Sequence, residues 1–431
     1  MRVDHRQKAS KFFNSILPVI IIIETIVLIS RVSGLHNSEL LINAGTKILD
    51  KSNPYEPYQP YGTPPALIYW MFHKLTFHTQ NPAFFILLNL LGVILVLHFL
   101  FPNLSNFSKQ KITVLILLTS PIRALVANVQ HTGIILGCLL LGYYFTKQHF
   151  NRKYLSPNLI GSIFFLISLE IKPQIALPFI LIFIIMNRNF RLFIIISAEL
   201  IFFRLIIDLW VGRILELEQF RVWKIMQNDN LTISEQTSMW KLLEKYFPNT
   251  LNWFQLSFIL YIVAVLLLIF IAININNDLI LKLALFIPLF TAYLHLYDLV
   301  VLAIVISFLV IQSISKFGAV IILGLIILPA RFHSPAELAN GLVFIFALIL
   351  IFTNLLIEKK YRILGSKILE SVVVLIFIKE LAVTGLTLEE KVSVQISVIF
   401  IFGLLYFGQY IYKNRLSEKS ILTLSYLKNR K

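Results

Sequence analysis

Residues 35–65, LHNSELLINAGTKILDKSNPYEPYQPYGTPP, form the polar interruption between a first apolar segment and a chain that is otherwise mostly hydrocarbon. The stretch carries the carboxylate of Glu39, a short helical pattern over residues 40–49 and five prolines after residue 53. Proline fixes its own φ and biases the preceding residue towards extended conformations, so residues 53–65 are expected to form a stiff non-helical loop. Such a loop is compatible with chemistry at a membrane surface and with a plain connection between two spans. The rest of the sequence is needed to distinguish these alternatives.

The composition places this loop in an integral membrane protein. Of the 431 residues, 58% are hydrophobic and 14% are charged, whereas soluble domains carry about 45–50% apolar and about 25% charged residues. The single cysteine, Cys138, excludes an intrachain disulfide and a cysteine metal cluster. The net charge of +16 is carried largely by short loops between apolar runs. Membrane topology explains this charge, and no nucleic-acid partner is expected.

Apolar runs that are long enough, or nearly long enough, to span a bilayer follow one another along the chain. The first, residues 12–32, is long and has no small-residue cleavage site after it, so it predicts an uncleaved span. The others cover residues 82–102, 111–126, 132–147, 157–171, 174–187, 190–210, 253–273, 279–294, 297–314, 317–330, 340–357, 367–384 and 392–412. Because a span needs about 20 residues, we expect an all-α polytopic membrane protein with about 12–14 transmembrane helices. Residues 64–78 are too short and mixed to span, and predict a helix at the interface.

The distribution of basic residues predicts the topology. With the N-terminus inside, more than half of the 38 Lys and Arg residues fall in inner segments, and both chain ends are basic. This pattern predicts a protein of the plasma or inner membrane with both termini in the cytoplasm. The polar stretches then all fall on the outer face, and we interpret them as a shared outward-facing cavity. They are residues 33–65, 121–131, 170–174, 211–252, 294–298 and 331–340.

Other sequence features limit the range of functions. The chain has no GxGxxG, no Walker A loop and no HExxH motif, so a nucleotide-hydrolysing transporter or a metalloprotease of those types is not supported. Charged residues inside apolar runs, among them Glu24 and Glu199, are costly in hydrocarbon and should face the bundle interior or a helix end. Arg204 and Asp208 are four residues apart, which predicts a local ion pair.

Five separated stretches of the chain carry polar motifs. They read HNSELLINAGTKILDKSNPYEP with YGTPPALIY, NVQHTGIILGCLLLGYYF, LEIKPQIALPFILIFIIMNRNFR, QTSMWKLLEKYF and LHLYDLVVLAIVI. Together they resemble glycosyltransferase family 87. They correspond, in family order, to its first outer loop, its Gly-Gln-Asn stretch, its Lys-Pro-Gln stretch, its Asn-Gln-Ser element and its late His/Tyr/Asp stretch.

The resemblance implies a fold and an activity. The fold is a C-type glycosyltransferase bundle with loop helices on the outer face, forming one membrane domain over residues 1–431. Its core would cover residues 12–315, with outer loops at 33–81 and 211–252, and residues 316–431 would add further transmembrane helices. The activity is that of a polyprenyl-phosphate-sugar-dependent transferase, often of mannose.

Glu39 and Lys172 are the residues to which the resemblance gives the main chemical roles. The alignment places Asn37 where the family has its catalytic aspartate, and Glu39 lies two residues further on, so Glu39 is our candidate general base. The plain alternative for Glu39 is a solvated carboxylate favoured by the helix dipole. Lys172, just before Pro173, is our candidate for binding the donor phosphate, and its alternative is a lysine that anchors the end of a span.

A second group of candidates lies in the other matching stretches. His295 and Asp298 are three residues apart and would share one face of a continuous helix. We expect His295 and Arg123 to help bind the donor phosphate, although interface anchoring also explains Arg123. The substrate-binding candidates are Asn37, Tyr55, Tyr61, Gln130, His131, Gln174, Gln236, Ser238, Tyr297 and Asp298. Capping or structural hydrogen bonds are the alternatives for Gln130 and His131.

The sequence therefore predicts a membrane hexosyltransferase that inverts the anomeric centre and needs no metal. A phosphate is already a good anionic leaving group, so it requires positive charge and hydrogen bonds, and no cofactor beyond the lipid-linked donor. The expected partners are membrane lipids, the polyprenyl-phosphate sugar donor and a lipid or glycan acceptor. The alternatives are a transporter or flippase of polyprenyl-linked glycans, which often shows inverted repeats, and a glycan polymerase or ligase.

Overall fold

A computed structural model describes the parts of the chain on which the following sections rest. These are residues 2–30, 36–54, 67, 70, 83–127, 130–148, 155–215, 217, 218, 221, 253–274, 278–291 and 296–311. The chain divides into two compact units, Met1–Val301 and Leu302–Lys431. The predicted division between a core and further spans at residue 315 lies outside the described residues, as does most of the predicted interface helix at 64–78.

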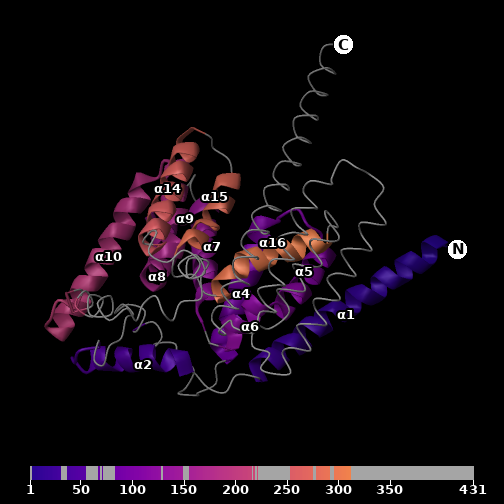
Figure 1. Ribbon diagram of the computed structural model, residues 1–431, viewed down its shortest axis with the longest axis horizontal. Helices are drawn as coiled ribbons and strands as arrows, with labels where there is room; N and C mark the ends of the chain where they lie inside the picture. The colour runs from indigo at the N-terminus through magenta and orange to yellow at the C-terminus, as the bar shows by residue number, and fades with distance from the viewer. Residues whose placement is uncertain are drawn as a thin grey trace, which may run out of the picture. The chain divides into compact units, whose positions relative to one another are not determined.

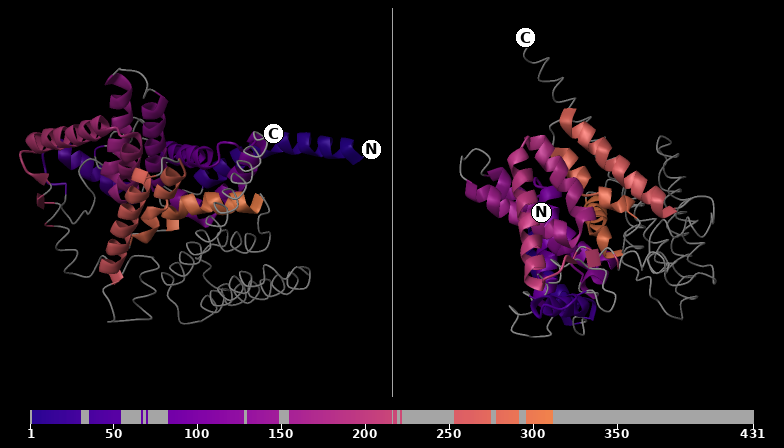
Figure 2. Two further views of the ribbon diagram at one scale, coloured as in Figure 1. Left: turned by 90° about the horizontal axis from the view of Figure 1, so that it is seen from above. Right: turned by 90° about the vertical axis from the view of Figure 1, so that its left-hand side faces the viewer.

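Every regular element in the described ranges is a helix, in agreement with the predicted all-α fold. Figure 1 labels these helices along the chain, and Figure 2 shows them from two further sides. The first unit contains α1 (Arg2–Ser30), α2 (His36–Leu49), α4 (Ala83–Leu100), α5 (Asn106–Leu118), α6 (Ser120–Ala127), α7 (Thr132–Gln148), α8 (Leu155–Ile171), α9 (Pro173–Asn187), α10 (Phe190–Val211), α14 (Trp253–Asn274), α15 (Asp278–Ala284), η1 (Ile287–Phe290) and η2 (Leu296–Leu299). Helix α16 (Val300–Ile311) follows η2 directly.

Helices α4 and α7 pack against each other with their backbones in close contact. A Cβ atom at Gly92 of α4 would lie well under 3 Å from the carbonyl group of Gly133 of α7, and one at Gly137 would lie 3.0 Å from the Cα of Gly92. Neither neighbour is a flexible side chain that could move aside, so the approach requires glycine. This contact fixes the start of α7, where the functional candidates lie, against the middle of α4.

An aromatic cluster joins the other ends of α4 and α7 to α9. The ring of Tyr143 lies edge to face with those of Phe99 and Phe183, at centroid distances of 5.2 and 5.5 Å. Phe179 contacts Phe99 in the same manner at 5.9 Å. Such pairs contribute about 0.5–1.5 kcal/mol each beyond the burial of their area, and they hold the three helices as one packed group.

Local signals set the limits of the helices. Pro173 has no N–H to donate and is favoured in the first turn, so α9 begins there after a single non-helical residue. The side chain of Asn189 caps the start of α10 by accepting a hydrogen bond from the N–H of Leu192 at 3.2 Å. Gly212 ends α10 in the left-handed conformation, with φ of 73°.

Two of the predicted spans are wrong as continuous helices. Residues 111–126 form the C-terminal part of α5 and nearly all of α6, because Thr119 is extended and Pro121 follows in the first turn of α6. Residues 279–294 contain the short helix α15 and then the 3-10 helix η1, which has Pro288 in its first turn. In both cases proline removes a backbone donor inside an apolar run, and hydropathy alone does not register that loss.

Two helices in the described part of the chain are long and apolar enough to cross a membrane, Ala83–Leu100 and Gln255–Asn274. Four shorter apolar helices accompany them, Ile16–Ser30, Thr132–Lys147, Asn158–Ile171 and Pro173–Asn187. The described helices therefore agree with a helical membrane protein.

Helix α2, formed by the polar stretch that follows α1, packs on the core through one apolar face. Its residues Ile42, Ala44 and Ile48 are buried in a cluster with Ile134 of α7 and with the C-terminal end of α10. Figure 1 shows α2 at that end of α10. Because Ile134 is in the first turn of α7, the cluster places α2 beside the N-terminal end of that helix.

Candidate functional site

A buried polar cluster joins Thr132, Lys172 and Asp298, which come from three distant parts of the sequence. The ammonium nitrogen Nζ of Lys172 lies 2.6 Å from Oδ1 of Asp298. The hydroxyl of Thr132 donates to the same carboxylate oxygen at 2.6 Å and accepts a hydrogen bond from Lys172 at 3.1 Å. The side chains of Lys172 and Asp298 are only 10% and 5% exposed.

The backbone explains why Lys172 reaches this position. Lys172 is the single residue between α8 and α9, with φ of −143° and ψ of 83°, so Pro173 imposes the break on its N-terminal side. The carbonyl of Lys172 accepts from the N–H groups of Ile175 and Ala176 at 3.0 and 3.1 Å. The side chain of Lys172 therefore begins at the first turn of α9 and extends to a buried carboxylate. A lysine that anchors the end of a span would instead extend to the membrane surface.

Asp298 lies in η2, and Thr132 is the first residue of α7. Carboxylates are favoured in the first turn of a helix because the unpaired N–H groups there make it positive. A buried ion pair is stabilising only if its remaining lone pairs and protons are satisfied, and the hydroxyl of Thr132 supplies one of those hydrogen bonds.

His131 lies next to this cluster and is also buried. Burial, and to a smaller degree the positive charge of Lys172, lowers the pKa of its imidazole from 6.5 to about 3, while the charge of Asp298 opposes the change. His131 is therefore neutral at physiological pH and can donate through one ring nitrogen and accept through the other.

Asn89 of α4 fixes the start of α7 and was not predicted from the sequence. Its side-chain oxygen accepts a hydrogen bond from the N–H of Ile134 at 3.2 Å, and its amide group donates to the carbonyl of Phe85 at 2.9 Å. The first N–H groups of a helix have no acceptor within the helix. Asn89, on a neighbouring helix, supplies an acceptor for one of them. The available signal was an amide in an otherwise apolar span, which must find a partner there.

A second ion pair lies two residues before Lys172. Arg204 of α10 binds Glu170 of α8 through two parallel hydrogen bonds, Nε to Oε1 at 3.1 Å and Nη2 to Oε2 at 3.0 Å. The side chain of Glu170 is only 3% exposed, so it requires a cation. The sequence did not predict this pair between helices. Asp208 accepts a hydrogen bond from the N–H of Leu215 at 3.0 Å, and the predicted pair of Arg204 with Asp208 stays a prediction.

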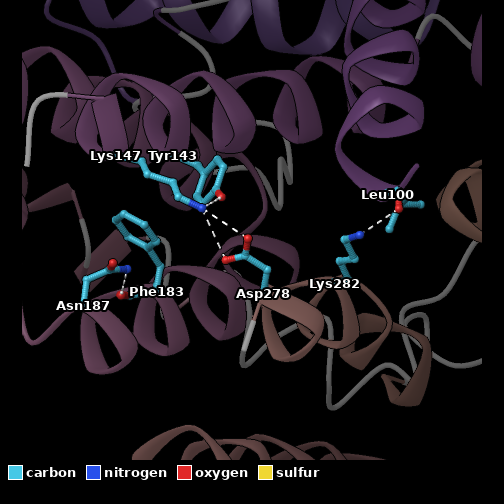
Figure 3. Close-up of polar contacts among 7 residues, drawn as sticks. All are labelled: Leu100, Tyr143, Lys147, Phe183, Asn187, Asp278 and Lys282. Carbon is cyan, nitrogen blue, oxygen red and sulfur yellow. Dashed lines mark hydrogen bonds and ion pairs between the residues drawn. The ribbon is translucent and has the colours of Figure 1, made fainter. Parts of the chain in front are cut away.

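A third set of polar contacts lies at the other end of α7 (Figure 3). Lys147 donates to the hydroxyl of Tyr143 at 2.6 Å and binds the carboxylate of Asp278 at 3.2 Å. Lys282 donates to the last carbonyl of α4, that of Leu100, at 2.8 Å, which is a favourable place for a cation at a helix C-terminus. Thr132 and Lys147 are separated along α7 by about 22 Å at the usual helical rise, so the clusters of Lys172 and Lys147 lie at opposite ends of α7.

The structure thus brings together His131, Lys172 and Asp298, which the sequence placed in three separate outer stretches. Gln130 and Gln174 adjoin the cluster in sequence and are partly exposed, and the carbonyl of Gln174 accepts from the hydroxyl of Tyr261 at 3.1 Å.

The remaining predicted site residues lie elsewhere or outside the description. Arg123 is partly buried in α6. Asn37 and Glu39 belong to α2 and Tyr297 to η2, with side chains outside the described ones. Five further positions lie outside the described residues altogether: Tyr55, Tyr61, Gln236, Ser238 and His295.

Comparisons with known proteins add no assignment. No protein-family model, no curated protein and no solved structure matches the chain.

Proposed function

We propose that this protein is an integral membrane glycosyltransferase that transfers a hexose from a polyprenyl-phosphate donor to a lipid or glycan acceptor on the outer face. The observation that carries the proposal is the buried ammonium of Lys172, held at the meeting point of three predicted outer stretches. A phosphate leaving group is stabilised by a preorganised cation and hydrogen-bond donors in a water-poor site. Lys172, Thr132 and neutral His131 are groups of that kind.

The surfaces of α10 and α14 support a membrane location. Large apolar side chains point outward along both helices, with Leu209 81%, Phe202 66% and Phe270 67% exposed. Exposed apolar surface of this extent is unfavourable in water and suits contact with lipid tails. With the apolar lengths of α4 and α14, it favours a protein embedded in a bilayer.

The proposed reaction is a single displacement at the anomeric carbon of the donor sugar. Glu39 removes the proton of the acceptor hydroxyl, whose oxygen forms the new bond to the anomeric carbon. The bond from that carbon to the phosphate oxygen breaks, and its electron pair leaves with polyprenyl phosphate, whose negative charge Lys172 stabilises. One displacement inverts the configuration of the anomeric centre.

The packing of α2 supports Glu39 as the base. Ile42, one turn beyond Glu39 on α2, is buried in the same cluster as Ile134, which is two residues beyond Thr132 on α7. The helix that carries the proposed base is therefore adjacent to the helix end that carries the proposed phosphate site.

The test is sugar transfer from a panel of radiolabelled polyprenyl-phosphate hexoses by proteoliposomes containing wild-type protein or Glu39→Gln. We expect one donor to be used, a product with inverted configuration, and a loss of at least 100-fold in the variant. Transfer that survives Glu39→Gln would remove Glu39 as the base. If no donor of the panel is used, the glycosyltransferase proposal fails.

Transport of a polyprenyl-linked glycan is the second candidate, and one set of observations favours it. Charged groups are placed between helices, Glu170 with Arg204, and Glu199 with the hydroxyl of Ser162 at 2.7 Å. Charges inside transmembrane bundles commonly mark transport pathways. Movement of a fluorescent lipid-linked glycan across the vesicle membrane, without sugar transfer, would select this candidate.

A further inference from the structure

Lys172 already has an anionic partner within the protein. Asp298 Oδ1 lies 2.6 Å from Lys172 Nζ, a short charge-assisted contact, and both side chains are almost completely buried. A donor phosphate that approaches Lys172 therefore meets a carboxylate in the position that the phosphate itself needs. Two anions close together in a poorly solvated site repel each other strongly.

We propose that Asp298 is a resident counter-ion that the donor phosphate replaces on Lys172, and that it is not a ligand of the sugar. The inference rests on the proposed function, because it assigns the phosphate of that reaction to Lys172. In the substrate-free protein Asp298 keeps the buried ammonium compensated. When the phosphate group binds, the contact between Lys172 and Asp298 is exchanged for one between Lys172 and a phosphate oxygen.

Thr132 is placed to follow this exchange. Its hydroxyl accepts from Lys172 and donates its single proton to Asp298. A hydroxyl hydrogen rotates freely about the C–O bond, so the same proton can turn from the carboxylate to a phosphate oxygen while the bond from Lys172 is kept. The two helices whose N-terminal residues lie at the cluster, α7 and α9, are each long enough to favour an anion there in either state.

The exchange has a consequence for selectivity. A buried lysine without a counter-ion would attract any small anion that reached it, whereas the pair with Asp298 makes the resting site neutral. A phosphate must then gain enough from the rest of the ligand, such as the polyprenyl chain in the membrane, to displace the carboxylate. Asp298 would thus weaken the binding of every phosphate at Lys172, so that a lipid phosphate, which gains further contacts in the membrane, binds at concentrations at which a free phosphate does not.

The test measures binding of polyprenyl phosphate without a sugar, and of inorganic phosphate, to the full-length protein in nanodiscs. We expect Asp298→Asn to bind polyprenyl phosphate at least tenfold more tightly than wild type, because the competing carboxylate is removed. Lys172→Met should lose binding. The double variant Lys172→Met/Asp298→Asn is the matched control, since removing both charges of a buried pair preserves folding better than removing one. It should bind neither probe.

The two probes separate the sources of the phosphate. If Asp298→Asn binds polyprenyl phosphate more tightly than wild type but does not bind inorganic phosphate more tightly, the lipid is the ligand of the exchange. Tighter binding of both probes would keep the exchange and show that the carboxylate also keeps free phosphate away from Lys172 in the wild-type protein, whereas tighter binding of inorganic phosphate only would assign the exchange to free phosphate. If Asp298→Asn binds polyprenyl phosphate as weakly as wild type, or more weakly, Asp298 assists the ligand and the proposal is overturned.

A second measurement does not use Asp298→Asn and so does not depend on the folding of that variant. Infrared difference spectra recorded on addition of polyprenyl phosphate should show a shifted carboxylate stretching band, which is absent from the double variant. A wild-type spectrum without that band would overturn the exchange. Both measurements report binding rather than transfer, so exchange without sugar transfer would leave this inference standing while the glycosyltransferase proposal fails.

Discussion

Acidification should destabilise the folded protein through His131. Burial, and to a smaller degree the charge of Lys172, lowers the pKa of this imidazole from 6.5 to about 3. Because the folded-state pKa is the lower one, the stabilising contribution is complete above pH 6.5 and is lost as the pH falls towards 3. Between these values the unfolded chain binds a proton that the folded protein does not bind.

The size of the effect follows from the two pKa values. The free energy of unfolding should fall by about 1.4 kcal/mol for each pH unit below 6.5, which amounts to about 2 kcal/mol at pH 5. Other groups titrate in the same range, so wild type has to be compared with His131→Gln, which keeps a polar side chain but cannot become charged. The measured quantity is the difference between their free energies of unfolding.

Reversible unfolding in mixed micelles between pH 7.5 and pH 5 gives this difference. We expect this difference to be constant above pH 7. At pH 5 the wild-type protein should have lost about 2 kcal/mol of its free energy of unfolding relative to His131→Gln. A difference that does not change with pH would mean that His131 binds protons equally well in the folded and unfolded states. That result would refute its placement as a buried neutral group beside Lys172.

Three further predictions concern packing and pairing between helices. Gly92→Ala should destabilise the protein by about 3 kcal/mol or more because its new methyl group meets backbone atoms of α7, whereas Leu91→Ala on the exposed side of α4 should cost under about 1 kcal/mol by the same unfolding assay. A loss below 1 kcal/mol for Gly92→Ala would contradict the close contact. Glu170→Gln should cost about 1–3 kcal/mol because it removes the negative charge that the partly exposed Arg204 binds through two hydrogen bonds. The double variant Glu170→Gln/Arg204→Met should recover most of the loss, and a double variant no more stable than Glu170→Gln would refute this. Asn89→Leu should cost about 1–3 kcal/mol because a buried N–H of α7 loses its acceptor, and equal stability of the variant and wild type would show that the bond contributes nothing.

The sequence predicted the grouping of His131, Lys172 and Asp298 through topology. Each lies at the end of an apolar run, and the distribution of basic residues assigned these three ends to one face of the membrane. Helix ends on the same face of a bundle can meet, and in the structure these three do. Thr132, the hydrogen-bond partner of Lys172 and Asp298, was not predictable in this way, because its role depends on the angle at which α7 begins.

Contacts between helices were the part that the sequence could not supply. Spacing along one helix suggested Asp208 for Arg204, but the pair with Glu170 depends on how α8 packs against α10. Likewise, hydropathy treated residues 111–126 and 279–294 as continuous spans, whereas proline interrupts both helices. Proline positions were visible in the sequence, and they carried more information about helix limits than the apolar runs did.

The most direct test of the account compares two lysines at opposite ends of α7. Lys172 and Lys147 each bind an aspartate, but only Lys172 is buried in the proposed phosphate site. In proteoliposomes supplied with the preferred polyprenyl-phosphate hexose, we expect Lys172→Met to lower kcat/KM for sugar transfer by about 100-fold or more, as for loss of a group that stabilises a leaving anion. Lys147→Met should leave it within about threefold, the scale of a surface ion pair. Equal effects of the two variants, or full activity without Lys172, would contradict the assignment of the phosphate to this cluster.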